Sequence, residues 1–227
     1  MQTRRNWIMP PARTPPKLKK NPRSNARADR IPPTAHRAAR HRSSDLILVN
    51  RQNRAIGRAD KALVHAKGLR HRAFSIFLVD SAGRLLLQRR SRAKYHSGGL
   101  WANSCCGHPC PHERTLTAAR RRLSEELGVS VRLTFGFLTH YQTAFSNGLQ
   151  ENEVVHVYFG LVPAELHPNR DEVMETALLT LAELEADVLR QPNRYAFWLR
   201  HYLKHHRQTI ESGLSLMVGR SSEVRPN

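Results

Sequence analysis

The chain has 227 residues, 40% of them hydrophobic, and its 37 Lys and Arg against 18 Asp and Glu give a formal net charge of +19. This composition excludes a chain without a hydrophobic core, and no stretch approaches the roughly 20 apolar residues that a membrane helix needs. The charge first suggests a nucleic acid or another anionic surface as the partner.

The first 44 residues carry most of that charge. They hold twelve Lys and Arg against the single acid Asp29, and seven of the 13 prolines. With so little apolar surface, residues 1–44 are predicted to form a disordered, basic, Pro/Arg-rich extension. Its role stays open between an anionic tether, a transit peptide, and an upstream extension without function that precedes a later start at Met9. The net charge of +8 that remains over residues 45–227 is moderate and suits a protein that handles a phosphorylated small molecule.

Periodicity in residues 45–206 predicts a single domain. Strands are expected at 46–49, 73–80, 84–90, 129–141 and 153–162. Helices are expected at 115–127, 178–189 and 193–205, followed by a flexible tail at 207–227. Strands first, one helix in the middle and helices at the end are typical of an α/β domain with a largely non-parallel sheet.

The three cysteines, Cys105, Cys106 and Cys110, lie within six residues. An odd, clustered set makes a poor disulfide framework and indicates a reducing compartment and local chemistry. The N-terminus also lacks the apolar segment of a secretory signal, so we expect a cytoplasmic protein. A structural zinc site built from these cysteines and His108 is the alternative, although a second, distant ligand pair of the usual kind is missing.

Residues 107–129 combine a predicted helix with a characteristic spacing. Thr115 is the expected N-cap and Gly128 the stop of this helix. The spacing is carried by Gly107, Glu113, Arg121, Glu125, Glu126 and Gly128. It resembles the Nudix box, a loop–helix–loop that holds a divalent metal against a diphosphate. Arg122 stands where the box has Glu, and the exchange of a carboxylate for a cation argues against diphosphate hydrolysis. Glu113 and Glu125 are interpreted as helix-surface residues.

Two pairs of residues two positions apart add candidate metal ligands. In an extended segment, residues i and i+2 project to the same face. This applies to Glu151 and Glu153, at the head of an apolar strand, and to Cys106 and His108. Two further imidazoles lie upstream, at His65 and His71. Three imidazoles and two carboxylates form a plausible octahedral or near-octahedral site, for which Mn²⁺, Mg²⁺ and Zn²⁺ are candidates.

Taken together, Asn103-Ser-Cys-Cys-Gly-His-Pro109 and Glu151-Asn-Glu-Val154 resemble the type I isopentenyl-diphosphate isomerase family. The resemblance covers about residues 45–205 and includes Lys61–His65, Arg70–Phe74 and Arg89–Cys106. It implies a Nudix-type α/β/α sandwich with a mixed sheet.

The resemblance also implies roles for the matching residues. The metal set would be His65, His71, His108, Glu151 and Glu153. Glu126 would bind the Mg²⁺ that bridges to the substrate diphosphate. The cations that clamp this diphosphate would be Lys61, Arg90 and Lys94, which suits cationic side chains that face an oxyanion.

The implied reaction is a 1,3-proton shift between isopentenyl diphosphate and dimethylallyl diphosphate through a tertiary carbocation. It needs an acid and a base on opposite faces of the alkene, which the resemblance assigns to Cys106 and Glu153. We expect Glu153, assisted by Tyr141, to protonate and Cys106 to act on the other face, with the reverse order left open. Aromatic faces would stabilise the cation. Trp101, which suits the core equally well, is one candidate, and Tyr195 stands where the family commonly has Trp.

Two other functions are considered. A Nudix hydrolase that cleaves a nucleoside diphosphate derivative would need neither Cys106 nor the pair Glu151 and Glu153. A basic nucleic-acid-binding module would depend on residues 1–44, and its binding would be lost with that segment. We therefore expect an isomerase that acts on a small molecule as a monomer, without a nucleic-acid or membrane partner.

Overall fold

The computed structural model describes residues 44–223. Its strands are β1 (Asp45–Val49), β2 (Ala55–Asp60), β3 (His71–Val79), β4 (Leu85–Arg90), β5 (Trp101–Asn103), β6 (Cys105–Gly107), β7 (Thr134–Ala144), β8 (Gln150–Leu161) and β9 (Val173–Leu179). Its helices are α1 (Lys61–Lys67), α2 (Thr115–Leu127), α3 (Leu181–Arg190) and α4 (Phe197–Glu223), with a 3-10 turn at η1 (Pro192–Arg194). None of these helices combines the length and the apolar character that a membrane span requires. The predicted extension lies outside the described residues, except for Ser44.

β3 is the central strand of one mixed sheet. It runs parallel to β8 along its whole length, and β7 pairs antiparallel with the other edge of β8. On its opposite edge β3 pairs antiparallel with β1, β6 and β4, and β4 continues the sheet to β5 and β9. This register places His71 opposite Glu153 and Ser75 opposite Cys106. The expectation of a mixed, largely non-parallel sheet is confirmed.

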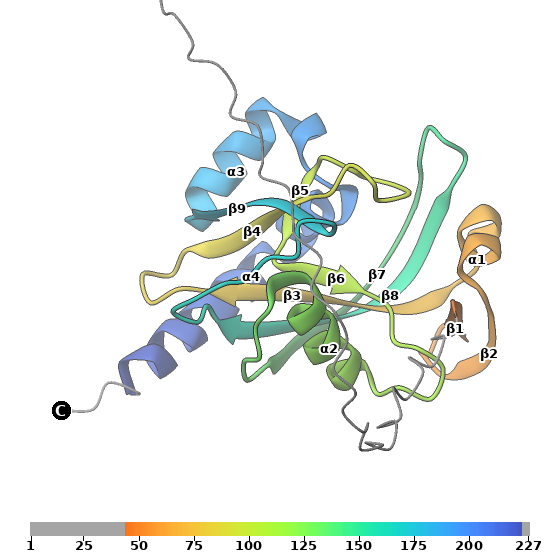
Figure 1. The fold of residues 1–227 in the computed structure, drawn as a ribbon, viewed down its shortest axis with the longest axis horizontal. Coiled ribbons are helices and arrows are strands. Elements are labelled where there is room, and N and C mark those ends of the chain that lie inside the picture. The colour runs from red at the N-terminus through yellow and green to blue at the C-terminus, as the bar shows by residue number, and fades with distance from the viewer. Residues whose placement is uncertain (1–43, 224–227) are drawn as a thin grey trace, which may run out of the picture. The chain divides into compact units, whose positions relative to one another are not determined.

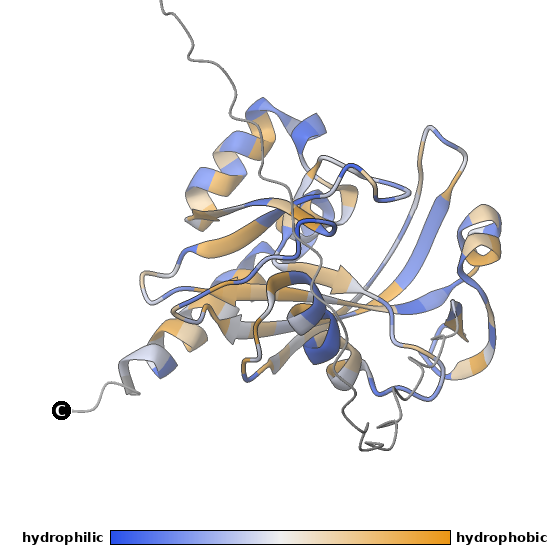
Figure 2. Ribbon diagram, viewed as in Figure 1, coloured by the Kyte–Doolittle hydropathy of each residue, from blue (hydrophilic) through white to orange (hydrophobic). Residues whose placement is uncertain are grey.

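Helices cover both faces of this sheet, with α2 in front of it and α4 behind it in the view of Figure 1. The alternation of β3 separates two cores. Phe74, Ile76 and Leu78 pack with the apolar face of α2, whereas Phe77 and Val79 pack with α3 and α4. Both faces of the central strand β3 are therefore covered by helices, which is the α/β/α sandwich that was expected. Figure 2 shows apolar residues along the central strands and hydrophilic ones at the start of β8, beside α1.

The turn between α1 and β3 brings two predicted ligands together. Asp60 caps α1 by accepting hydrogen bonds from the backbone amides of Ala62 and Leu63. Gly68 ends the helix with φ 60°, a left-handed conformation, and a Cβ there would lie 2.6 Å from a side-chain oxygen of Gln150. The sharp reversal leaves the rings of His65 and His71 with their centroids 5.0 Å apart.

Residues 207–223 differ from the flexible tail that was expected. α4 continues through them to Glu223, with non-helical dihedrals only at His206 (φ −132°, ψ 21°). Ile210, Leu214 and Met217 are buried in the core behind the sheet. Their i, i+4, i+7 spacing is a short apolar stripe, and it holds the second half of the helix against the domain.

Several predicted boundaries also shift: the strand predicted at 129–141 is β7 (Thr134–Ala144), and the helix predicted at 193–205 begins at Phe197. Two further differences have a local cause. The helix expected at 178–189 begins at Leu181, because Thr180 forms a capping box with Glu183 and residues 173–179 pair with β4 as a strand. α2 begins at Thr115, so the N-cap position falls on Arg114, which makes no side-chain capping bond.

Candidate active site

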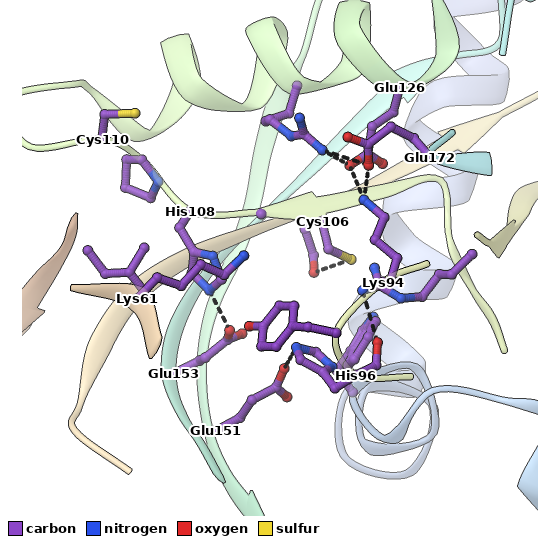
Figure 3. Close-up of a pocket in the computed structure, with 18 of the residues that line it drawn as sticks. Lys61, Lys94, His96, Cys106, His108, Cys110, Glu126, Glu151, Glu153 and Glu172 are labelled. Carbon is purple, nitrogen blue, oxygen red and sulfur yellow. Dashed lines mark hydrogen bonds and ion pairs between the residues drawn. The ribbon is translucent and has the colours of Figure 1, made fainter. Parts of the chain in front are cut away.

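One cavity of about 420 Å³ lies where β3, β6 and β8 meet α1 and α2, a volume in the range of ligand pockets. The predicted site residues that line it are Lys61, Arg90, Lys94, Cys106, His108, Glu126, Tyr141, Glu151 and Glu153. His65 and His71 stand beside His108, with ring centroids 5.6 and 5.0 Å away. Figure 3 shows Cys106 between the His108–Glu153 side of the cavity and the Lys94 side.

Strand alternation turns Cys106 into the cavity. Its Sγ lies 3.1 Å from Asn103 Oδ1, to which the thiol donates, and 3.4 Å from Ser75 Oγ. Trp198 Nε1 donates to the same Asn103 oxygen at 3.1 Å. Burial raises the pKa of the Cys106 thiol to about 12. The sulfur is therefore a protonated thiol at neutral pH, held in a fixed position.

The other two cysteines do not join Cys106 in a metal site. Cys105 is fully buried on the opposite face of β6, in the core under α2. Cys110 lies near Arg121, with its sulfur 3.8 Å from Nη2. Among the described residues, the groups able to hold a metal contain only His and Glu. The alternative of a structural zinc site on these cysteines is therefore not supported.

Four of the five predicted metal ligands form one compact group. The donor atoms of His65, His71, His108 and Glu153 lie within 4.8 Å of one another. His65 and His71 donate from Nδ1 to the backbone oxygens of Lys61 and Leu69, at 2.7 and 2.8 Å. Each ring therefore turns its Nε2 toward the centre of the group, as in metal sites with oriented imidazoles. Burial lowers the pKa of His65, and that of His108 to about 3, so both rings are neutral and able to bind a metal.

The fifth ligand, Glu151, lies beside Glu153 on β8 as the i, i+2 spacing predicts. Tyr141 Oη is 2.9 Å from Glu151 Oε2 and 2.7 Å from Glu153 Oε2, so one phenol bridges both carboxylates. Burial, followed by the charge of Glu153, raises the pKa of Glu151. Burial acts in the same direction on Glu153, but His108 and His71 hold the pKa of that carboxyl well below its usual range. The five predicted metal ligands are called the imidazole–carboxylate group below: His65, His71, His108, Glu151 and Glu153.

The donor set fits a divalent metal. Neutral imidazoles and carboxylates in a buried cluster are ligands of Mn²⁺, Zn²⁺ and related ions. His71 Nε2 and His108 Nε2 are 3.2 Å apart, and His108 Nε2 is 2.8 Å from Glu153 Oε1. A cation bound between these closely packed donor atoms would stabilise their arrangement in the buried pocket.

Five Lys and Arg residues line the same cavity, and one of them, Arg121, pairs with Glu113 and Glu125. The other four are Lys61, Arg90, Lys94 and Arg122. They are called the cation group. Burial, together with the neighbouring cations, lowers the pKa of Lys61. Arg90 is nearly buried, and its Nε has no hydrogen-bond acceptor among the described residues. Clustered cations with an unsatisfied buried donor form a binding surface for an anion.

Two carboxylates face this cation group. Glu126, which is 1% exposed, accepts from Gln88 Nε2 at 3.0 Å, pairs with Arg122 and lies 3.7 Å from Lys94 Nζ. Glu172 pairs with Lys94 and lies 3.3 Å from Arg122 Nη2. Both carboxylates would be available as ligands for a metal ion that accompanies a bound diphosphate.

The two predicted aromatic residues are not brought to this cavity. Trp101 and Tyr195 form an isolated bridge with each other and line a separate depression near α3. Trp198 lines the cavity instead, 3% exposed, with the guanidinium of Arg90 5.1 Å from its ring centroid.

Several cavity residues were missed by the sequence reasoning. Arg122 was interpreted only as a departure from the Nudix box. It stands four residues before Glu126, on the same face of the helix, and this spacing was the signal that the two side chains would pair. Glu172 lies in a loop and no motif marked it. Tyr95 and His96 follow Lys94 directly, and their proximity to a predicted cation was the available signal.

Comparisons with known proteins agree with this geometry. The NUDIX domain model matches residues 69–203. A protein of Aromatoleum aromaticum named isopentenyl-diphosphate Delta-isomerase 2 is 47% identical over 154 residues, which cover 68% of this chain and 82% of the relative. An isopentenyl-diphosphate Delta-isomerase of Streptomyces griseus is 42% identical over 78% of this chain and 94% of its own. A crystal structure of a Deinococcus radiodurans protein superposes with a TM-score of 0.53 and 25% identity, over 64% of this chain and 89% of that one.

Proposed function

The chain belongs to the isopentenyl-diphosphate Delta-isomerase family and carries a NUDIX domain, and on this premise we propose how its residues carry out the reaction. The reaction is the interconversion of isopentenyl diphosphate and dimethylallyl diphosphate by a 1,3-proton shift. Cys106 and Glu153 act on opposite faces of the alkene. The observation that carries this proposal is that both residues face one cavity whose wall also bears the cation group.

The cation group binds the diphosphate. Lys61, Arg90 and Lys94 supply donors from three separate elements, and Arg122 adds a fourth from α2. Mutual repulsion among buried cations is relieved when an anion binds, so the group favours a ligand with several negative charges. Glu126 would hold the Mg²⁺ that accompanies the diphosphate.

The imidazole–carboxylate group supports the proton chemistry. Its five residues would hold Mn²⁺, Mg²⁺ or Zn²⁺, which when bound polarises the Glu153 carboxyl. Tyr141 donates to Glu153 and fixes the orientation of that carboxyl. Asn103 accepts a hydrogen bond from the Cys106 thiol, and Ser75 Oγ contacts the same sulfur, so both fix its position.

The proton shift proceeds in two steps. A proton added to the terminal methylene carbon of isopentenyl diphosphate gives a tertiary cation, and loss of a proton from the carbon on its other side gives the product. Because the reaction is reversible, the residue that donates in one direction accepts in the other. In each turnover one member of the pair Cys106 and Glu153 must therefore carry the proton that is added, and the other must be unprotonated to accept the proton that is lost.

The aromatic lining protects and stabilises the cation. Trp198 is anchored to Asn103, the residue that also binds the Cys106 thiol, so its ring lies near the reacting sulfur. Aromatic ring faces attract a cation through their quadrupole, and they exclude the water that would capture it. We assign to Trp198 the role that was expected of Trp101 or Tyr195.

The test is incubation of the purified protein with isopentenyl diphosphate and divalent metal in deuterated water. Deuterium-labelled dimethylallyl diphosphate is expected, and a chelator should abolish its formation until metal is restored. Release of phosphate or pyrophosphate without isomerised product would instead identify a hydrolase.

A further inference from the structure

His96 occupies a place in the cavity that the proposed reaction leaves without a role. It is 8% exposed, and its Nε2 lies 3.2 Å from Glu151 Oε1. The other oxygen of Glu151 accepts from Tyr141. A buried carboxylate is thus held at both oxygens, one by a phenol and one by an imidazole.

The loop that carries His96 is shaped to deliver it there. Ser97 and Gly99 adopt positive φ angles of 52° and 78°, and the amide of Gly99 donates to the carbonyl of Arg90 at 3.0 Å. A Cβ at Gly98 would lie 2.8 Å from the backbone oxygen of Arg92, so the loop closes only with glycine at this position. The tight closure places the side chain of His96 in the wall of the cavity.

The ring of His96 has a fixed orientation. It stacks on Phe145 with centroids 5.0 Å apart and planes inclined by 14°, and it meets Trp198 edge-on at 6.0 Å. Ser97 Oγ lies 3.3 Å from Nδ1. With Nδ1 accepting from that hydroxyl, the remaining proton is on Nε2, directed at Glu151.

His96 contacts the metal-binding cluster through Glu151. The four-residue group of His65, His71, His108 and Glu153 does not contain it, whereas His96 groups with His65 and Glu151. Outer hydrogen bonds of this kind orient a ligating carboxylate, and their loss typically weakens metal binding 10- to 100-fold.

We propose that His96 is a positioning residue that orients the Glu151 carboxylate toward the metal centre by donating from Nε2. This inference rests on the proposed function in one respect, the assignment of Glu151 as a ligand. Its consequences are nevertheless measurable on the protein without substrate.

The test compares metal affinities of the full chain and three variants by titration with Mn²⁺ against a chromophoric chelator. His96→Phe keeps a ring on Phe145 and removes the donor, so the affinity should fall about 10- to 100-fold. His96→Gln keeps a donor at the same reach and should stay close to wild type. His205→Phe, at an exposed histidine of α4, is the matched control and should have no effect.

Two readouts separate positioning from simple packing. The Mn²⁺ concentration for half-maximal activity should rise in His96→Phe, while KM for isopentenyl diphosphate at saturating Mn²⁺ stays unchanged. The visible spectrum of the Co²⁺-loaded His96→Gln protein should match that of wild type, because His96 does not itself coordinate. A shifted spectrum would make His96 a ligand and overturn the positioning role.

The outcomes distinguish this inference from the proposed function. Wild-type affinity in His96→Phe would overturn the role of His96 and leave the isomerase intact. A weakened His96→Phe alongside a wild type that incorporates no deuterium would support His96 and refute the isomerase.

Discussion

The imidazole–carboxylate group and the cation group share one cavity but are built in opposite ways. The first is carried mostly by paired strands, with His71 opposite Glu153 in the register of β3 and β8. The second consists of long side chains from two helices, a strand end and a loop, and Glu126 and Glu172 lie between two of them, Lys94 and Arg122. Strand pairing fixes atoms to the precision that proton transfer needs, whereas a flexible set of cations suffices for a diphosphate. Substitutions in the first group should therefore affect turnover and those in the second should affect substrate binding.

Glu153→Gln should have the largest effect, because this residue serves as both ligand and proton carrier. Isomerisation should fall toward the upper end of the roughly 10²–10⁴-fold range of acid–base residues, and Mn²⁺ affinity should fall with it. Steady-state kinetics and the chelator titration measure the two losses. Glu165→Gln, at an exposed loop residue, is the control, and an intact Mn²⁺ affinity in Glu153→Gln would contradict the double role.

Cys106→Ala should lower kcat by about 10³-fold, within the range for one acid–base group. Unlike Glu153→Gln, it should leave both Mn²⁺ affinity and diphosphate binding intact, because the thiol contacts Asn103 and Ser75 rather than a metal ligand. Circular dichroism and inhibitor binding check the fold. A near-normal kcat would refute the assignment of Cys106.

The pH dependence of alkylation tests the raised pKa of Cys106. The pKa of Cys106 is raised to about 12, compared with 9.0 for an unperturbed thiol, and a Cys105→Ala, Cys110→Ala protein, in which only this thiol remains, is expected to keep the raised value. The thiolate is the form that reacts with iodoacetamide. At a pH well below both pKa values, the thiolate fraction of Cys106 should be about a thousandfold smaller than that of a free thiol. The iodoacetamide rate should rise about tenfold per pH unit through neutral pH and beyond, without levelling near 9. A plateau there would show an unperturbed thiol.

Arg90→Gln should have the smallest of these effects and a different signature. Loss of one charged donor should raise KM for isopentenyl diphosphate about 10- to 100-fold, as expected for a hydrogen bond to a charged group, with kcat changed less. Arg89→Gln is a close control, because Arg89 points away to Glu175 and the backbone of Gly99. Equal effects of the two changes would contradict the separation of the groups.

The sequence predicted correctly those features of the fold and the site that depend on residues close together in the chain. Glu151 and Glu153 were placed together correctly because strand alternation is a local rule. Helix α2 was recognised for the same reason, from its apolar spacing and its terminal Gly128. The choice of Cys106 over Cys105 depended on its place beside Gly107 and His108, and β6 indeed turns the two sulfurs to opposite faces.

The parts that escaped prediction depend on contacts distant in the sequence. The contact of Arg122 with Glu172 spans 50 residues of the chain and that of His96 with Glu151 spans 55, so both depend on the tertiary arrangement of the sheet. Trp198 rather than Tyr195 reaches the cavity because the chain enters α4 through a bridge between Tyr195 and Trp101. The helix over 207–223 was missed because its apolar stripe is sparse and gains its stability from the core that it covers.

The proposed metal ligands run from His65 in α1 to Glu153 in β8, so a metal bound there would join segments that are far apart in the chain. An unfolded chain cannot bring these atoms together, and a metal bound there stabilises the native state alone. By mass action, a free metal concentration roughly 100 times Kd adds about 2.7 kcal/mol to the free energy of unfolding. We therefore expect the resistance of this protein to heat and proteolysis to increase with the metal supply of its surroundings.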